Sequence, residues 1–96
     1  MITVSREWLA KDGLLEEAIE NAKEYRELFD SSSSWRIRTP TSERFRVIVE
    51  EDYESYAEAE EKWNERGGLP EFRSWIAEWR RVAVANTLAF NYHARH

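Results

Sequence analysis

VIVEEDYESYAEAEEKW, residues 47–63, contains the change of periodicity that decides the fold. From Arg44 to Glu50, Phe45, Val47 and Val49 fall on one face and Arg44, Arg46, Ile48 and Glu50 on the other, which is the period of a β-strand. From Asp52 onward, aromatic and small residues recur at helical spacing until Gly67-Gly68 interrupts the pattern. The stretch therefore predicts a strand at 44–50 that is followed directly by a helix.

The C-terminal part of the chain continues this order. Pro70 begins a second helical piece, because proline suits the first turn of a helix. This piece carries the strongest apolar stripe of the sequence, from Phe72 to Ala83. The last stretch, 84–93, alternates again and predicts the final strand.

The N-terminal half shows the same two periods. Alternation predicts a strand before Asp12-Gly13, and one apolar stripe predicts a helix after it. The complete order is βαββαβ, which predicts a single α+β domain, 1–96, with a ferredoxin-like fold and an antiparallel sheet in the order 4-1-3-2. The expected elements of this half are a strand at 2–8, a helix at 15–30, a break at Ser31–Ser34, a strand at 35–39 and a hairpin connection at 40–43.

The predicted strands have one apolar face and one mixed face. The apolar face suits the helices and comprises Ile2, Val4, Trp35, Ile37, Phe45, Val47 and Val49. The mixed face comprises Thr3, Ser5, Glu7, Arg36, Arg38, Arg46, Ile48 and Glu50. This second face is either exposed to solvent or forms a polar interface with a second copy of the chain. We expect a homodimer, because opposed charges on a two-fold face pair across the axis.

Composition argues against several classes of function. The formal charge of −5 at pH 7 disfavours nucleic acid as a partner, because phosphate binding requires a basic surface. The chain has no cysteine, no signal-peptide pattern and no apolar run of about 18 residues, so we expect a cytoplasmic protein without membrane association. Segment 50–61 carries seven carboxylates and no basic residue, which we interpret as the solvated start of a helix and not as a metal site.

Three stretches of the sequence resemble the dimeric α+β barrel superfamily, and most of all its NIPSNAP-like branch. They are ITVSREWLAKDGLLEEAIENA at 2–22, VIVEEDYESYAEAEEKW at 47–63 and LPEFRSWIAEWRRV at 69–82. The resemblance implies a ferredoxin-like fold whose sheet packs face to face with that of a second chain. Members of the superfamily include cofactor-free monooxygenases, haem-handling proteins, isomerases and many proteins of unknown activity. A shared fold does not choose among these activities.

Arg6 has the most unusual placement in the sequence, because it falls in the register of the apolar face, between Val4 and Trp8. One interpretation is a cation at a pocket mouth that holds a carboxylate or an enolate. The other is an arginine that extends to water or pairs with a helix glutamate. The aromatic residues either line a cavity around Arg6 or fill a core. The candidates for such a cavity are Trp8, Trp35, Trp63, Trp75 and Tyr92.

The two histidines offer limited chemistry. His93 is a candidate for proton transfer or haem ligation, whereas His93 and His96 together lack a third ligand for a metal site. Phosphate-loop, serine-elbow and HExxH motifs are missing from the sequence.

Three functions remain open at this stage. The leading hypothesis is a homodimer that binds a small, partly apolar organic ligand in an aromatic-lined pocket formed by Arg6, Trp8, Trp35 and Tyr92, without a cofactor. The second is a cofactor-independent monooxygenase or isomerase in which Arg6 stabilises an oxyanion and His93 or Tyr92 moves a proton. The third is a structural dimer with a solid core. Pocket volume separates the third hypothesis from the others, and turnover separates the first two.

Overall fold

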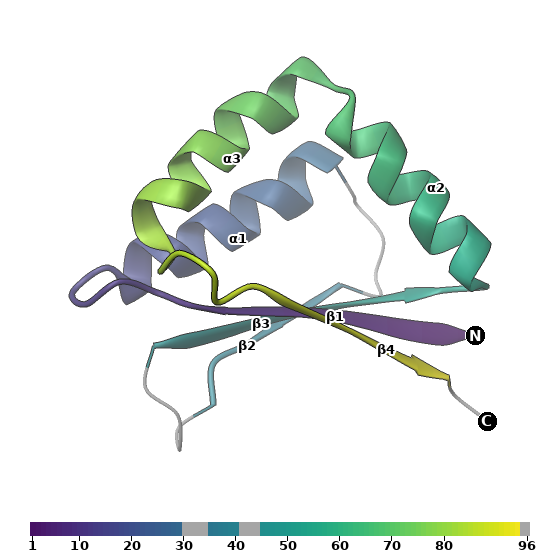
Figure 1. Ribbon diagram of the computed structural model, residues 1–96, viewed down its shortest axis with the longest axis horizontal. Helices are drawn as coiled ribbons and strands as arrows, with labels where there is room; N and C mark the ends of the chain where they lie inside the picture. The colour runs from purple at the N-terminus through teal and green to yellow at the C-terminus, as the bar shows by residue number, and fades with distance from the viewer. Residues whose placement is uncertain (30–34, 41–44, 95–96) are drawn as a thin grey trace.

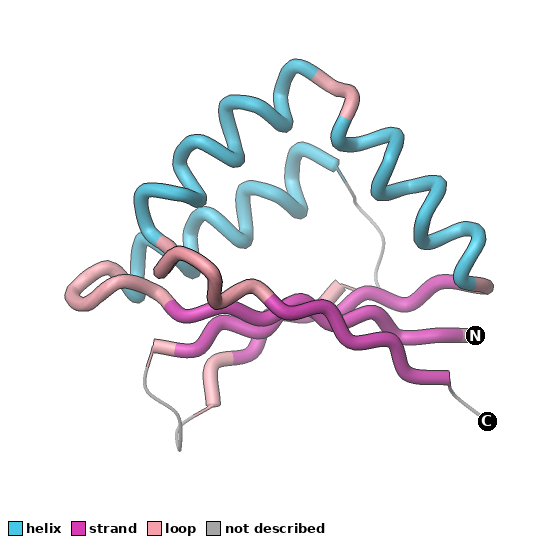
Figure 2. The backbone as a smooth tube through the Cα atoms, viewed as in Figure 1, coloured by secondary structure: helices cyan, strands magenta, loops and turns pink. Residues whose placement is uncertain are grey.

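The chain forms two layers, with three helices on one face of a four-stranded antiparallel sheet (Figures 1 and 2). The computed structural model describes residues 1–29, 35–40 and 45–94. The predicted break at Ser31–Ser34, most of the connection at 40–43, Arg44 and His96 lie outside these residues. The elements are β1 (Ile2–Leu9), α1 (Leu15–Phe29), β2 (Arg36–Arg38), β3 (Arg46–Tyr53), α2 (Tyr56–Gly67), α3 (Pro70–Val82) and β4 (Ala89–Ala94).

The order of strands in the sheet is β2-β3-β1-β4, which confirms the predicted 4-1-3-2 arrangement. β1 lies in the centre and pairs antiparallel with both β3 and β4. Its register places Arg6 opposite Val49 on one side and opposite Phe90 on the other. The fold is therefore the expected ferredoxin-like α+β arrangement.

The boundary between β3 and α2 lies later than the sequence pattern indicates. β3 continues to Tyr53, and Ser55 caps α2 by accepting a hydrogen bond from the backbone N–H of Glu58 at 3.2 Å. The prediction that the helix starts at Asp52 was wrong, because pairing with Ile2–Val4 extends the strand through three more residues. The predicted interruption at Gly67-Gly68 is confirmed, and Pro70 opens α3.

The last strand is shorter than the predicted stretch 84–93. β4 begins only at Ala89, because Asn86 has a left-handed backbone with φ of 64° that ends any extended run. In this turn the Thr87 hydroxyl donates to the carbonyl of Val84 at 2.7 Å and accepts from the backbone N–H of Leu9 at 3.1 Å. The Thr87 side chain therefore makes the hydrogen bond to the end of β1, where the prediction expected the backbone of a paired strand.

The hydrophobic core lies between the sheet and the helices α1 and α3. Trp75 of α3 packs against Tyr25 of α1 with ring centroids 4.8 Å apart, and its indole N–H donates to the backbone carbonyl of Asn21 at 2.7 Å. The predicted apolar sheet face is the one that the helices cover, since Val47, Val49 and Trp35 belong to this core. The interior therefore forms as the strand alternation indicates.

Candidate functional site

A cluster of charged side chains lies inside the helix-covered side of the sheet. Arg6 on β1 donates through Nη2 to Oε1 of Glu51 on β3. Arg66, at the end of α2, donates through Nη1 to Oε2 of the same carboxylate at 3.1 Å. Glu51 is only 1% exposed, and both arginines are buried. Two guanidinium groups thus share one carboxylate, and the cluster carries an excess positive charge.

Two tyrosines complete the polar contacts of this cluster. Arg66 Nη1 lies 3.0 Å from the hydroxyl of Tyr25 and 3.2 Å from that of Tyr53. The Tyr53 hydroxyl donates to Oε2 of Glu51 at 2.5 Å. Burial, followed by the charge of Glu51, raises the pKa of Tyr53 well above its usual range. Tyr53 therefore stays protonated at neutral pH and acts as a hydrogen-bond donor.

The protonation state of Arg66 is equally secure. Burial lowers the pKa of this group, but the negative charge of Glu51 and the contact with Tyr25 outweigh burial and raise it. Aromatic rings also stabilise the cations: the guanidinium carbon of Arg6 lies 4.7 Å from the ring centroid of Tyr25 and 5.2 Å from that of Trp63. Arg66 therefore stays cationic, and both arginines lie against aromatic rings as well as against Glu51.

A cavity of about 60 Å³ lies on one side of Arg6. Two of its tryptophans, Trp8 and Trp35, are buried, and among the described residues neither indole N–H has a hydrogen-bond partner. Leu88, 40% exposed, lies at its edge. The cavity is therefore an almost wholly apolar, ring-lined space, and the two unpaired indole N–H groups belong to residues that border it. The residues around it are Arg6, Trp8, Ala22, Tyr25, Trp35, Val49, Trp63, Trp75, Ile76, Trp79 and Leu88.

A second cavity, of about 20 Å³, lies on the other side of Arg6. Arg6 and Trp63 border both cavities, while Glu51 and Tyr53 border only this one. Tyr92 closes its outer side, where its ring packs against Tyr56 of α2 at 5.5 Å. Arg6 thus borders both a tryptophan-lined cavity and a smaller cavity that Glu51 and Tyr53 also border.

The predicted site residues are only partly brought together. Arg6, Trp8 and Trp35 meet at the first cavity, together with Trp63 and Trp75, and Tyr92 meets Arg6 at the second. In the part of the chain that the structure describes, Trp8 and Tyr92 border different cavities, and Arg6 borders both. The predicted solvent contact of Arg6, or its pairing with a helix glutamate, is also replaced by an ion pair with Glu51 on the neighbouring strand.

His93 lies apart from the other candidates. It is paired in register with Thr3, so it lies on the open face of the sheet, whereas Tyr92 is paired with Val4 on the helix-covered face. His93 and Arg6 therefore cannot act on the same small molecule within one chain. Within the part of the chain that the structure describes, no group of three or more possible ligands is placed to hold a metal ion.

Sequence reasoning missed Glu51 and Arg66. The interpretation of segment 50–61 as a solvated helix start was wrong for Glu51, because β3 continues through it and directs it inward opposite Val4. The signal was present in the alternation itself, which places Glu51 in phase with Val47 and Val49. Arg66 carried no comparable signal, since its burial follows from where α2 ends.

Ion pairs within the chain connect neighbouring strands on the mixed face of the sheet. Arg36 pairs with Asp52 at 3.1 Å, Arg38 with Glu50 at 2.6 Å, and Arg46 with Glu7 at 3.2 Å. These pairs join neighbouring strands across the face that the sequence assigns to a dimer interface. At its centre Thr3, Ser5 and Ile48 are buried already within one chain.

Solved structures of other proteins have the same fold. A NIPSNAP family protein from Agrobacterium tumefaciens superposes with a TM-score of 0.83 at 11% identity, over 99% of this chain and 92% of that one. A NIPSNAP domain protein from Burkholderia xenovorans gives a TM-score of 0.79 at 12% identity, over 100% and 95%. The chain has the NIPSNAP-type fold. The resemblance inferred from sequence is confirmed at this level.

The NIPSNAP-type fold is also that of known oxygenases. A cofactor-independent oxygenase from Streptomyces nogalater superposes with a TM-score of 0.72 at 8% identity, over 99% of this chain and 92% of that one. No protein-family model and no curated protein sequence matches the chain. Within the described residues no helix is long and apolar enough to cross a membrane. At such low identity these likenesses show the fold alone. Any chemistry must be inferred from the side chains of the site.

Proposed function

We propose that this protein binds a small, partly apolar organic molecule with an acceptor oxygen in the cavity beside Arg6. The observation that carries the proposal is the pair of indole N–H groups of Trp8 and Trp35, which are buried without a partner among the described residues. An unsatisfied buried donor costs about 1–3 kcal/mol, and a ligand oxygen would remove this cost. The positive excess of the Arg6, Glu51 and Arg66 cluster favours an anionic oxygen.

The size of the cavity limits the ligand. About 60 Å³ is the volume of roughly two water molecules in the liquid, so a ring-sized ligand requires the cavity to open. Leu88 and Trp79 border it next to the turn around Asn86, and movement of this edge would enlarge the space. This small volume also keeps open the third hypothesis, a structural dimer with a solid core.

Homodimerisation through the mixed sheet face is part of this proposal. The helices cover the opposite face, and the mixed face has a buried centre with charged pairs around it (Figure 2). Its ion pairs would contribute register and specificity more than affinity. Reversing both Arg36 and Arg38 to glutamate is expected to shift the protein toward monomer in sedimentation equilibrium at micromolar concentration. A wild-type monomer in both low and moderate salt would contradict the dimer.

The second candidate is cofactor-independent oxygenation, which the likeness to the Streptomyces nogalater oxygenase favours. In this case Arg6 would stabilise the oxyanion, and Tyr92 is the predicted proton-transfer residue on the same face of the sheet. His93 would act only from the open face. A cytoplasmic location and the absence of a cofactor remain predictions from the sequence.

The ligand proposal is tested by titrating the full chain with small carboxylates, from propionate to benzoate, and with the matched alcohols. We expect the indole N–H resonances of Trp8 and Trp35 to shift on carboxylate addition, and Trp8→Phe and Arg6→Met each to weaken binding. Arg73→Met removes an exposed arginine of α3 that borders neither cavity and should leave binding unchanged. The proposal fails if no compound moves these resonances, or if the three variants bind alike.

A further inference from the structure

An acidic groove lies between α1 and α3, away from both cavities. It has a volume of about 500 Å³ and shares no bordering residue with the two cavities beside Arg6. Lys23 is the one basic side chain among the described residues that border it. Six carboxylates border it as well: Glu16, Glu17, Glu20, Glu24, Glu27 and Glu78.

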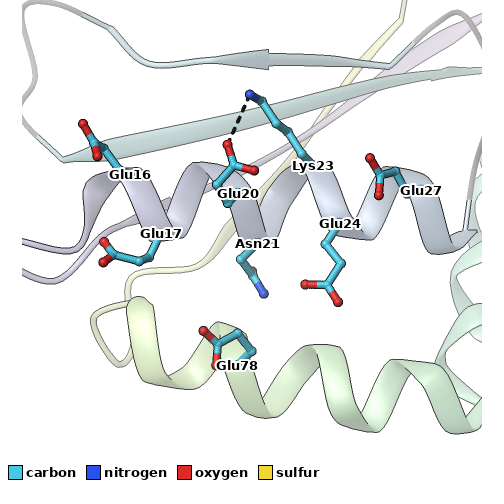
Figure 3. A pocket seen from close by; sticks show the side chains of 8 residues that line it. All are labelled: Glu16, Glu17, Glu20, Asn21, Lys23, Glu24, Glu27 and Glu78. Atoms are coloured by element: carbon cyan, nitrogen blue, oxygen red, sulfur yellow. Dashed lines mark hydrogen bonds and ion pairs between the residues drawn. The ribbon is translucent and has the colours of Figure 1, made fainter.

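Three of the six carboxylates, those of Glu17, Glu24 and Glu78, lie near one buried amide, whereas Glu16, Glu20 and Glu27 point away from it. Glu17, Asn21 and Glu24 are four and three residues apart, so they lie on one face of α1. Figure 3 shows these three side chains pointing toward α3, from which Glu78 approaches. Lys23 points the other way, where it pairs with Glu20 at 3.4 Å. The inner part of the groove is therefore acidic, with Asn21 at its centre.

Asn21 is the observation that points to a ligand. It is only 2% exposed, and neither Oδ1 nor Nδ2 has a hydrogen-bond partner within the described chain. Its backbone carbonyl accepts the indole N–H of Trp75 at 2.7 Å, which holds this turn of α1 against α3. Buried amides in folded proteins are normally paired, so an unpaired one at the floor of a groove indicates a missing partner.

The spacing of the carboxylates determines the kind of cation. A divalent ion requires several oxygen ligands at one point, and the described residues offer no such group of three. On the side of α1 that carries Asn21, the carboxylates of Glu17 and Glu24 are instead about 10 Å apart along the helix axis at 1.5 Å per residue. Separated charges of this kind match a ligand whose positive centres are also separated.

We propose that the groove binds a linear polyamine, with ammonium groups on Glu17 and Glu24 and one N–H donated to Oδ1 of Asn21. The methylene segments would lie along the aliphatic parts of the glutamates. Glu78 already has a cation partner within the chain, because Arg81 donates from Nη2 to Oε1 at 2.6 Å and from Nε to both oxygens at 3.0 and 3.1 Å. The site is independent of the ligand pocket beside Arg6.

The test is a titration of the full chain with spermidine at low salt and at 0.15 M salt, followed by amide NMR and calorimetry. We expect shifts confined to residues 16–27 and to Glu78, including the side-chain amide of Asn21. Glu17→Gln with Glu24→Gln should weaken binding by about three- to tenfold. Asn21→Leu should also weaken binding without lowering the melting temperature, because an apolar residue needs no partner there.

The matched control is Glu60→Gln with Glu61→Gln on α2, which makes the same change in net charge at exposed positions outside the groove. Equal weakening by both double variants would reduce the effect to general attraction and overturn the proposal. Magnesium binding with the same dependence on Glu17 and Glu24, or tetralysine binding at concentrations where spermidine does not bind, would also overturn it. A response only of the groove variants, strongest for spermidine, supports it.

Discussion

The helix-covered face of the sheet and its open face both carry arginine–carboxylate pairs, and adjacent residues of β3 supply the acids. Glu51 lies inward, where it meets Arg6 and Arg66 in a buried cluster. Glu50 lies outward, where it meets Arg38, whose side chain is 61% exposed. The same chemistry therefore occurs one residue apart in two different environments.

The difference between the two environments determines how much each charged pair affects the free energy of unfolding. An exposed pair replaces interactions with water that were nearly as good, so it contributes little. A buried pair is expensive to form, and removal of one partner leaves a charge without compensation. The open face can thus tolerate substitution, whereas the inner cluster determines whether the sheet and α2 remain together.

Replacement of Glu51 by glutamine should have the largest effect. It leaves Arg6 and Arg66 buried without an anion, so we expect the free energy of unfolding to fall by about 3–5 kcal/mol. Urea unfolding, or the yield of folded protein if the variant is too unstable, measures the loss. The matched control, Glu50→Gln, should cost less than about 1 kcal/mol. Equal losses for the two neighbours would contradict the contrast between the faces.

Replacement of Arg6 by methionine should cost less than Glu51→Gln. The remaining Glu51 and Arg66 still balance each other, so only one charged hydrogen bond is lost, and we expect about 1.5–3 kcal/mol in urea unfolding. This order of effects follows from the excess positive charge of the cluster. A cost for Arg6→Met as large as that for Glu51→Gln would show that the three groups act as one unit.

Tyr53 should make the inner cluster sensitive to alkaline pH. In the unfolded chain a tyrosine ionises near pH 10, while burial and Glu51 raise the pKa of Tyr53 in the folded chain. Its contribution to stability is therefore complete below about pH 10 and is lost as the pH rises further, by up to about 1.4 kcal/mol per pH unit. Unfolding of wild type and Tyr53→Phe between pH 9 and 11 measures the difference. If the stability of the two proteins changed with pH in the same way, ionisation of Tyr53 would not contribute to the loss.

Replacement of Arg38 by glutamine should have the smallest effect. The lost pair with Glu50 is mostly exposed, so we expect a change below about 1 kcal/mol that shrinks further in high salt. Unfolding at two salt concentrations measures it. A loss that depends on protein concentration would instead indicate that Arg38 lies in the proposed dimer interface.

The groove between α1 and α3 shows a similar contrast between exposed and buried polar side chains, here on one helix. Its carboxylates on α1 are exposed, but Asn21 among them is buried. An apolar stripe predicts which side of a helix faces the core. A polar residue at the edge of the stripe, such as Asn21, can be either buried or exposed.

The sequence by itself determined the order of elements, the strand order of the sheet and the face that the helices cover. It did so because a strand has a period of two and a helix a period of 3.6 residues, and both periods are written in local spacing. Arg6 stood out for the same reason, as a charge in an apolar register. The aromatic residues that line the first cavity were also visible as candidates.

Only the tertiary structure decided what Arg6 meets. Its partner Glu51 depends on how far β1 and β3 remain paired, and Arg66 depends on where α2 ends above the sheet. The shortened β4 likewise depends on a side chain, Thr87, that takes the place of a strand partner. These contacts join residues distant in sequence, and the free energy that selects them comes from burial and pairing in three dimensions, which local spacing does not record.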